Sequence, residues 1–160
     1  MKYIIKEMSY PYALEISSWQ YEKPYDFYNS EKSNEAIEEK LNGSYFIILD
    51  QTEEDILGFY CTGESAQVPK GNQYGVYAED LVDVGLGMNP RFVGQGRGYS
   101  FVAFILEEIE KNNPLQNIRL TVATFNKRAI HLYQSLGFTK KSRFDTDMAA
   151  FIMMVKVNKR

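Results

Sequence analysis

Hydrophobic and polar positions alternate with two different periods along this chain, and the changes of period predict where helices and strands lie. Apolar residues spaced three or four apart mark the segment 98–111 as a helix. The apolar positions that repeat there are Phe101, Val102, Ile105, Leu106 and Ile109. Short runs of β-branched and aromatic residues, such as SYFIILD at 44–50 and ILGFYCTG at 56–63, predict strands.

The same patterns over the whole chain predict about seven strands and about four helices. We expect strands at 3–8, 44–50, 56–63, 80–88, 118–124, 138–144 and 149–157. We expect helices at 11–19, 34–41, 98–111 and 126–136. Two polar segments, 20–32 and 64–80, follow neither period and are expected to be connections. This order predicts one mixed α/β domain over residues 1–160, with a parallel step wherever a helix joins two strands.

Length, charge and cysteine content narrow the class of protein. A chain of 160 residues fits one domain, and a net charge of −3 argues against nucleic acid or an anionic membrane as the main partner. The start, MKYIIKEMSYPY, lacks the apolar core of a signal peptide, and no apolar run reaches the ~20 residues that span a membrane. The only cysteine, Cys61, cannot form an internal disulfide, so we expect a cytoplasmic protein.

The stretch NPRFVGQGRGYS at 89–100 carries the first chemical signal. It is not a phosphate-binding P-loop, because Gly98 is followed by Tyr99 and Ser100 rather than by Lys-Ser/Thr. A dinucleotide fingerprint would require glycine at position 99. Glycines still let a backbone approach an anion, and the free amides at a helix start favour a phosphate or pyrophosphate. The alternative is a tight strand-to-helix turn without a ligand, and the glycines alone do not decide.

Two motifs give the chain a family resemblance. RFVGQG at 91–96 matches the signature Gln/Arg-x-x-Gly-x-Gly/Ala, and TVATFNKRAIHLYQSLGF at 121–138 is similar to the later stretch that ends in LY-x-x-LGF. The chain therefore resembles the GNAT superfamily, the GCN5-related N-acetyltransferases, over roughly 45–157. The resemblance implies a single GNAT-like α/β domain whose fourth and fifth strands splay apart. One departure is Val93, where many members have arginine.

The resemblance also implies a site for acetyl-CoA as co-substrate. The pantetheine arm would pair with backbone at the end of the fourth strand, and the pyrophosphate would lie on the amides of the glycine stretch. The implied binding residues are Leu86, Gly87, Met88, Arg91, Gly94, Gln95, Gly96, Arg97, Gly98, Tyr99, Ser100, Asn126 and Tyr133. For Asn126 a helix N-cap is a further role, and Arg97, Lys127 and Arg128 are as readily explained as solvated surface cations.

Acetyl transfer to an amine requires a donor for the developing oxyanion and a proton for the leaving thiolate. The resemblance places Tyr133 as the acid, and its alternative role is in the apolar core. The Met88 N–H is the candidate oxyanion donor. For the general base we select Asp83, with Glu64 in reserve; a surface carboxylate and proton loss to solvent are the alternatives.

Other candidates for chemistry are weaker. Cys61 lies in an apolar run where cysteine is usually a small core residue, and His131 lies off the apolar face of its helix. With one cysteine and one histidine, we expect no metal site.

These observations favour an N-acetyltransferase that acts by direct attack of a primary amine, on a small molecule or a peptide N-terminus. A non-catalytic acyl-CoA sensor on the same fold is the alternative. An aromatic group either walls the acceptor pocket or packs a loop onto the sheet; its members are Trp19, Tyr21, Tyr25, Phe27 and Tyr28. Nearby Glu22, Asp26 and Glu31 would favour a cationic amine. The protein is expected to be a monomer or a homodimer.

Overall fold

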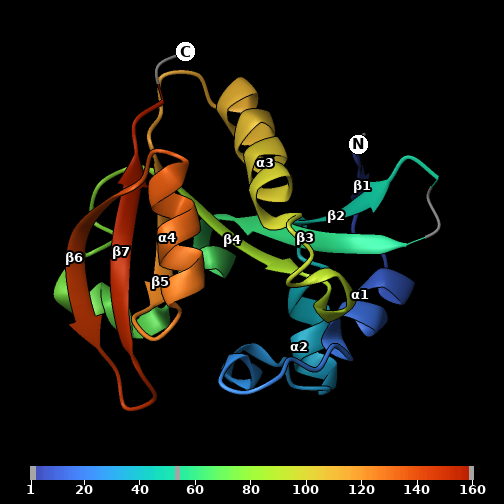
Figure 1. Cartoon of the computed structure of the whole chain (residues 1–160). Coiled ribbons are helices and arrows are strands. Elements are labelled where there is room, and N and C mark those ends of the chain that lie inside the picture. The colour runs from blue at the N-terminus through green and yellow to red at the C-terminus, as the bar shows by residue number, and fades with distance from the viewer. Residues whose placement is uncertain (1–2, 53–54, 159–160) are drawn as a thin grey trace. The chain divides into compact units, whose positions relative to one another are not determined.

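The structure is a computed structural model of the chain, and it describes residues 3–52 and 55–158 (Figure 1). The chain forms two compact units. The first consists of Met1–Cys61 and Leu86–Gly98, and the second of Thr62–Gly85 and Tyr99–Arg160. Strand β4 (Val82–Met88) contributes its first half to the second unit and its last three residues to the first.

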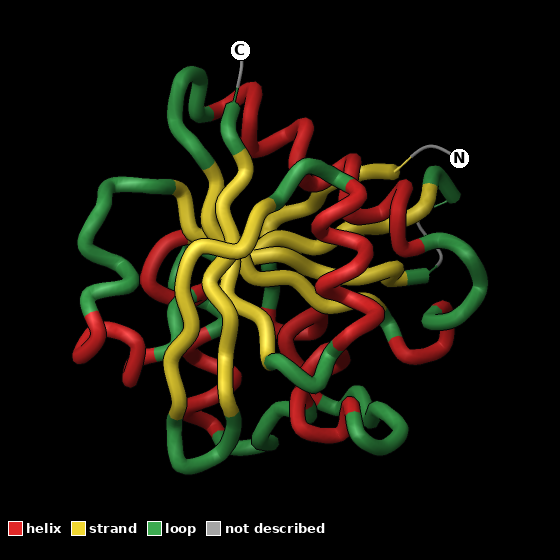
Figure 2. Tube along the Cα trace, turned by 60° about the vertical axis from the view of Figure 1, so that its left-hand side comes forward, coloured by secondary structure: helices red, strands yellow, loops and turns green. Residues whose placement is uncertain are grey.

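The strands, drawn yellow in Figure 2, form one seven-stranded sheet. Its hydrogen-bonded order is β1-β2-β3-β4-β5-β7-β6. The pairing of β4 with β5 is parallel, whereas the β1–β2, β2–β3, β5–β7 and β6–β7 pairings are antiparallel. The predicted α/β class with a mixed sheet is therefore confirmed. The splay of β4 from β5, and a single domain over 1–160, stay predictions.

In the first unit, β1 (Tyr3–Glu7), β2 (Tyr45–Asp50) and β3 (Ile56–Thr62) pair in sequence. Helix α1 (Tyr10–Ser17) has a proline in its first turn, where the missing N–H costs nothing. Helix α2 (Asn34–Glu39) begins at Ser33, whose hydroxyl accepts from the Ala36 amide. A core cluster joins α1 to β2 and β3; its buried members are Ile16, Trp19, Ile47, Leu49 and Ile56.

In the second unit, helices α3 (Gly98–Asn112) and α4 (Lys127–Ser135) join β4, β5 (Ile118–Ala123), β6 (Thr139–Asp145) and β7 (Ala150–Lys156). The five apolar positions predicted for α3 are the five that the structure buries. The β4–β5 register pairs Val82 with Ile118 and Asp83 with Arg119.

The two segments expected to be connections contain short 3-10 helices. The first holds η1 (Tyr25–Tyr28), and the second holds η2 (Gly63–Ala66) and η3 (Pro69–Tyr74). Helices of the 3-10 type are short, so they contain too few residues for an apolar period to be visible in the sequence.

Candidate active site

The end of β4 is packed closely against β3 within the first unit. A Cβ atom on Gly87 would lie 2.6 Å from Cε1 and 2.8 Å from Cζ of Phe59. A side chain at this position would therefore displace the aromatic ring or the strand. Leu86, Gly87 and Met88 are all half-buried, and the glycine lets the predicted pantetheine-binding backbone lie close to the Phe59 ring.

Asn89 anchors the step from β4 into the glycine stretch. Its backbone N–H donates to the Leu57 carbonyl at 2.8 Å, and its Nδ2 donates to the Ile56 carbonyl at 2.9 Å. Its Oδ1 accepts from the Arg91 amide at 3.0 Å and so caps the short 3-10 helix η4 (Pro90–Phe92). The Asn-Pro pair signals a turn in the sequence, but nothing there identifies the partners on β3.

The loop after η4 takes a left-handed backbone at two glycines. Gly94 has φ +80° and Gly96 has φ +75°, a conformation that side-chain-bearing residues rarely adopt. A Cβ added at either position would meet no atom within 4 Å. The glycines are therefore required by backbone geometry rather than by tight packing. Gln95, between them, donates through Nε2 to the Arg91 carbonyl at 3.0 Å.

Two arginines of this loop share one aromatic ring. The guanidinium carbons of Arg91 and Arg97 lie 5.4 and 4.9 Å from the centre of the buried Phe92 ring. Arg91 is largely exposed and also forms a 3.3 Å ion pair with Asp55. Positive charge is thus concentrated on the loop, which suits an anionic ligand there. Gly98 begins α3, and the predicted binding residues Tyr99 and Ser100 in its first turn are exposed.

The predicted residues of the second unit lie on and before α4. The Oδ1 of Asn126 accepts from the Ala129 amide at 3.2 Å, so the N-cap role is realised. Tyr133 is 9% exposed and packs against Phe138 with a ring separation of 5.9 Å and an interplanar angle of 62°. Core packing therefore accounts for the ring of Tyr133. Its role as acid, and the contact of Asn126 with the co-substrate, stay predictions.

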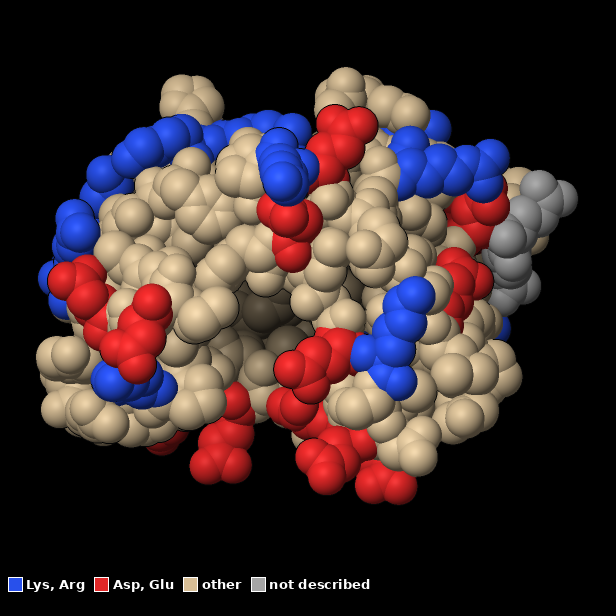
Figure 3. Space-filling view, turned by 90° about the horizontal axis from the view of Figure 1, so that it is seen from below, with Lys and Arg blue, Asp and Glu red and all other residues tan. Residues whose placement is uncertain are grey.

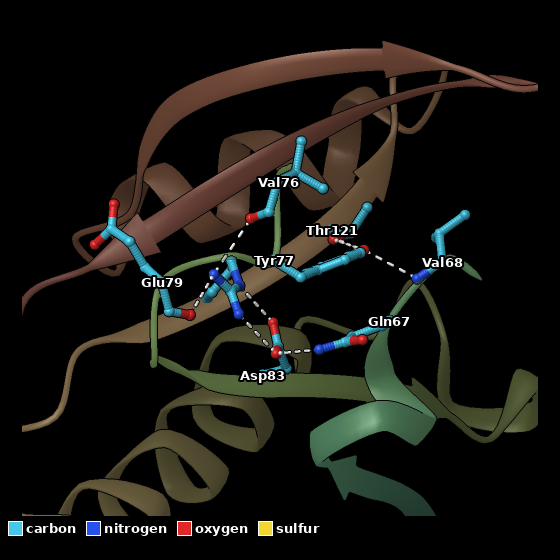
Figure 4. A network of polar contacts seen from close by, with 8 residues as sticks. Gln67, Val68, Val76, Tyr77, Glu79, Asp83 and Thr121 are labelled. Carbon is cyan, nitrogen blue, oxygen red and sulfur yellow. Dashed lines mark hydrogen bonds and ion pairs between the residues drawn. The ribbon is translucent and has the colours of Figure 1, made fainter. Parts of the chain in front are cut away.

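Asp83 lies in a buried ion pair (Figure 4). Arg119 Nε donates to its Oδ1 at 2.6 Å, and Arg119 Nη2 donates to its Oδ2 at 2.9 Å. Gln67 Nε2 adds a third bond, to Oδ2, at 2.9 Å. Both oxygens of the carboxylate are therefore held by donors. This geometry favours a structural role for Asp83 over the predicted role as general base.

Arg119 extends the network into the 64–80 connection. Its Nη1 donates to the carbonyls of Val76 and Glu79 at 3.2 and 3.1 Å, and its guanidinium lies 5.1 Å from the centre of the Tyr77 ring. The hydrogen bond to Asp83 raises the pKa of Arg119, although burial acts in the opposite direction. The reserve base, Glu64, is exposed in η2.

Tyr77 completes this arrangement in the second unit. Its hydroxyl accepts from the Val68 amide at 2.9 Å and shares a 2.8 Å hydrogen bond with Thr121 Oγ1 (Figure 4). The connection is thereby fixed to the middle of β5. The sequence signal for this network was the one charged residue, Arg119, inside the predicted strand IRLTVAT at 118–124.

The aromatic residues at 19–28 were predicted either to line the acceptor pocket or to pack a loop onto the sheet, and individual members differ in burial. Trp19 belongs to the buried core cluster and lies 6.1 Å from the Phe59 ring. Tyr21 is half-buried against the same cluster, whereas Phe27 and Tyr28 are 36% and 40% exposed. The acidic residues Glu22, Asp26 and Glu31 are exposed. Packing therefore explains Trp19, and the outer members keep their place as candidate acceptor contacts.

The positions of Cys61 and His131 agree with the sequence pattern. Cys61 is buried and His131 is exposed. Across residues 3–52 and 55–158, no group of three or more histidine, cysteine or acidic side chains is arranged to hold a metal ion. Of the helices in those same residues, none combines the length and apolarity needed to cross a membrane.

Charge is mixed on the molecular face drawn in Figure 3. Acidic and basic side chains both occur there, and neither sign covers the face. This mixture of signs fits the small net charge.

The sequence of this chain matches a known protein family. Residues 10–138 match the family described as Acetyltransferase (GNAT) family. The match covers most of the chain, and the chain belongs to this family of acetyltransferases. The family predicted from the two sequence motifs is thus confirmed.

Solved structures show the same fold. A chimera of the spermidine N-acetyltransferase SpeG from Vibrio cholerae and hSSAT aligns with a TM-score of 0.73 and 16% identity, over 99% of this chain and 96% of that one. SpeG from Vibrio cholerae in complex with manganese ions gives a TM-score of 0.67 at 16% identity, over 98% and 92%. A GnaT-family acetyltransferase described as putative, from Bordetella pertussis, gives 0.56 at 16% identity, over 71% and 65%. The search of curated proteins found no match.

Proposed function

We propose that this protein transfers the acetyl group of acetyl-CoA to a primary amine of a small molecule or a peptide N-terminus, by direct attack. Family membership supports the reaction class. The observation that carries the proposal is the loop at 91–98, where left-handed Gly94 and Gly96 keep side chains away from the backbone ahead of α3. Open amides before a helix are the groups that hold a pyrophosphate.

The residues of the loop fit the proposed co-substrate. Arg91 and Arg97 supply positive charge. Gly98 begins α3, and the first turn of a helix is where backbone N–H groups are not used by the helix itself. Val93 replaces the arginine common in the family, so phosphate binding here depends on the backbone and on these two cations. When bound, acetyl-CoA would supply an activated thioester carbonyl.

We assign two tasks to the chain and the removal of the amine proton to solvent. The Met88 N–H stabilises negative charge on the carbonyl oxygen as the amine nitrogen bonds to the carbonyl carbon. Tyr133 gives its phenolic proton to the sulfur as the carbon–sulfur bond breaks. The proton lost by the amine passes to solvent, because the predicted base Asp83 is held by Arg119.

The acceptor is proposed to be a cationic amine. The exposed acidic residues of 22–31, with the exposed rings of Phe27 and Tyr28, form a surface suited to an ammonium group. Structural neighbours titled as spermidine N-acetyltransferases make polyamines the first class to test. A cytoplasmic location and a monomeric or homodimeric state remain part of the proposal.

Thermal unfolding with acetyl-CoA tests the co-substrate. A ligand present at 100 times its dissociation constant should stabilise the folded state by about 2.7 kcal/mol. Acetyl-CoA should raise the melting temperature, and free adenosine at the same concentration should raise it less. An unchanged melting temperature up to millimolar acetyl-CoA would contradict the proposal.

A further inference from the structure

The peptide group that joins Met88 to Asn89 is held at both of its polar atoms. The Met88 carbonyl accepts from the Tyr21 hydroxyl at 2.8 Å. On the other side, the Asn89 N–H donates to the Leu57 carbonyl at 2.8 Å. All four residues belong to the first unit. A peptide plane bonded at both its oxygen and its nitrogen cannot rotate without losing a hydrogen bond.

Tyr21 is itself held in place by its own loop. Its backbone N–H donates to Asn29 Oδ1 at 2.8 Å, and Asn29 Nδ2 donates to Gln20 Oε1 at 3.1 Å. The Tyr21 ring packs on the core cluster that contains Trp19. The position of its hydroxyl is therefore fixed by the segment 20–29, although Tyr21 lies 67 positions before Met88 in the chain.

The hydroxyl is suited to act as a permanent donor. Burial raises the pKa of Tyr21 well above its ordinary value, so the phenol keeps its proton at every physiological pH. The carbonyl it binds has no proton to give, so the direction of this hydrogen bond is fixed from Tyr21 to Met88.

We propose that Tyr21 is a positioning residue for acetyl transfer. By holding the Met88–Asn89 peptide it restrains the backbone of Met88, whose own N–H, in the preceding peptide, is the candidate donor to the developing oxyanion. The inference rests on the proposed function, because it assigns Tyr21 a role in the same site. Tyr21 touches neither the acetyl group nor the amine. It acts through the backbone, and it joins the aromatic, acidic segment 20–31 to the strand end where the reaction is placed.

A purely structural role makes a different prediction. If the hydrogen bond only supported folding, its loss would lower stability and leave turnover per folded molecule unchanged. If it positions the Met88 N–H, its loss lowers kcat, since a displaced oxyanion donor stabilises the transition state less. Binding of acetyl-CoA is shared between the end of β4 and the glycine loop, so it would change less than kcat.

The test compares Tyr21→Phe with Tyr12→Phe in the full chain. Tyr12 is a second half-buried tyrosine packed on the same cluster, so its variant removes a hydroxyl from the same surroundings. CoA release is followed with two probe amines, spermidine and a short peptide with a free N-terminus. We expect Tyr21→Phe to lower kcat by about 10- to 100-fold while the KM for acetyl-CoA changes by less than about twofold. Tyr12→Phe should keep the wild-type kcat.

The outcomes separate this inference from the proposed function. If Tyr21→Phe and Tyr12→Phe turn over alike while the wild type is active, the positioning role is wrong and the proposed function stands. If the wild type acetylates neither probe amine, both proposals are overturned for these acceptor classes. Should Tyr21→Phe fail to fold, Asn29→Ala loosens the Tyr21 backbone and keeps its phenol. A wild-type kcat in folded Asn29→Ala would then overturn the inference.

Discussion

Arg119 and Asp83 form a bidentate ion pair whose two side chains are 2% and 5% exposed. They face each other because β4 and β5 run parallel with these two residues in register. Asp83, which was predicted to be the general base, is therefore held by an ion pair between β4 and β5. A buried charge pair of this kind stabilises little in total, but removing one member leaves the other charge uncompensated.

Asp83→Asn should therefore cost about 3–5 kcal/mol in the free energy of unfolding, because Arg119 would lose its buried counter-charge. Denaturant titration of the full chain measures it. The matched control is Asp145→Asn, which breaks the exposed pair of Arg143 and Asp145 and should cost at most about 1 kcal/mol. A folded Asp83→Asn variant of normal stability with abolished turnover would restore Asp83 as general base.

Gly96→Ala should weaken acetyl-CoA binding, because the left-handed backbone at this position would be strained by a Cβ atom. The cost to stability is about 1–2 kcal/mol. Gly43→Ala is the control, since Gly43 also has a left-handed φ, of +93°, with open space around its Cβ. Both variants should lose similar stability, but only Gly96→Ala should lose affinity in calorimetric titration. Equal affinities would show that the loop does not hold the co-substrate.

Tyr133→Phe should lower kcat by about 100-fold and leave the KM for acetyl-CoA almost unchanged, because a general acid acts only in the transition state. The buried ring and its contact with Phe138 are kept. Tyr74→Phe, which removes an exposed hydroxyl in the same unit, should be as active as the wild type. Full turnover by Tyr133→Phe with both probe amines would remove this residue from the chemistry.

Alkaline pH should destabilise the protein through two buried tyrosines. Burial raises the pKa of Tyr21 and of Tyr45 above the ordinary value of 10.0. Above pH 10 the unfolded chain loses these protons while the native state keeps them, so the free energy of unfolding falls as pH rises. Each retained proton contributes a slope of about 1.4 kcal/mol per pH unit at most.

Unfolding curves between pH 9 and 11.5 measure this slope. Tyr21→Phe should flatten it by removing one of the two retained protons. A slope that is the same in Tyr21→Phe and in the wild type would show that Tyr21 titrates normally in the native state.

The sequence predicted well those features that depend on neighbours along the chain. Helix α3 was visible from its apolar period, and the N-cap at Asn126 from the polar residue before an apolar face. Each of these signals is local, so no knowledge of the rest of the fold was needed.

Contacts between distant segments could not be predicted in the same way. Arg119 and Asp83 are 36 positions apart, and Tyr21 and Met88 are 67 apart. Taken alone in the sequence, none of these residues indicates which distant residue it contacts. Only the sheet register and the path of the 20–32 loop bring the partners together, which is why Asp83 was predicted as a base and Tyr21 only as part of an aromatic group.

The most direct test of acetyl transfer is the mass of the acceptor. The purified full chain is incubated with acetyl-CoA and, separately, with spermidine, amino acids, an aminoglycoside and a peptide with a free N-terminus, and each amine is analysed by mass spectrometry. We expect at least one amine to gain a single acetyl group, with release of an equal amount of CoA. Binding of acetyl-CoA with no acetylated amine in any of these reactions would contradict the catalytic assignment and favour an acyl-CoA sensor.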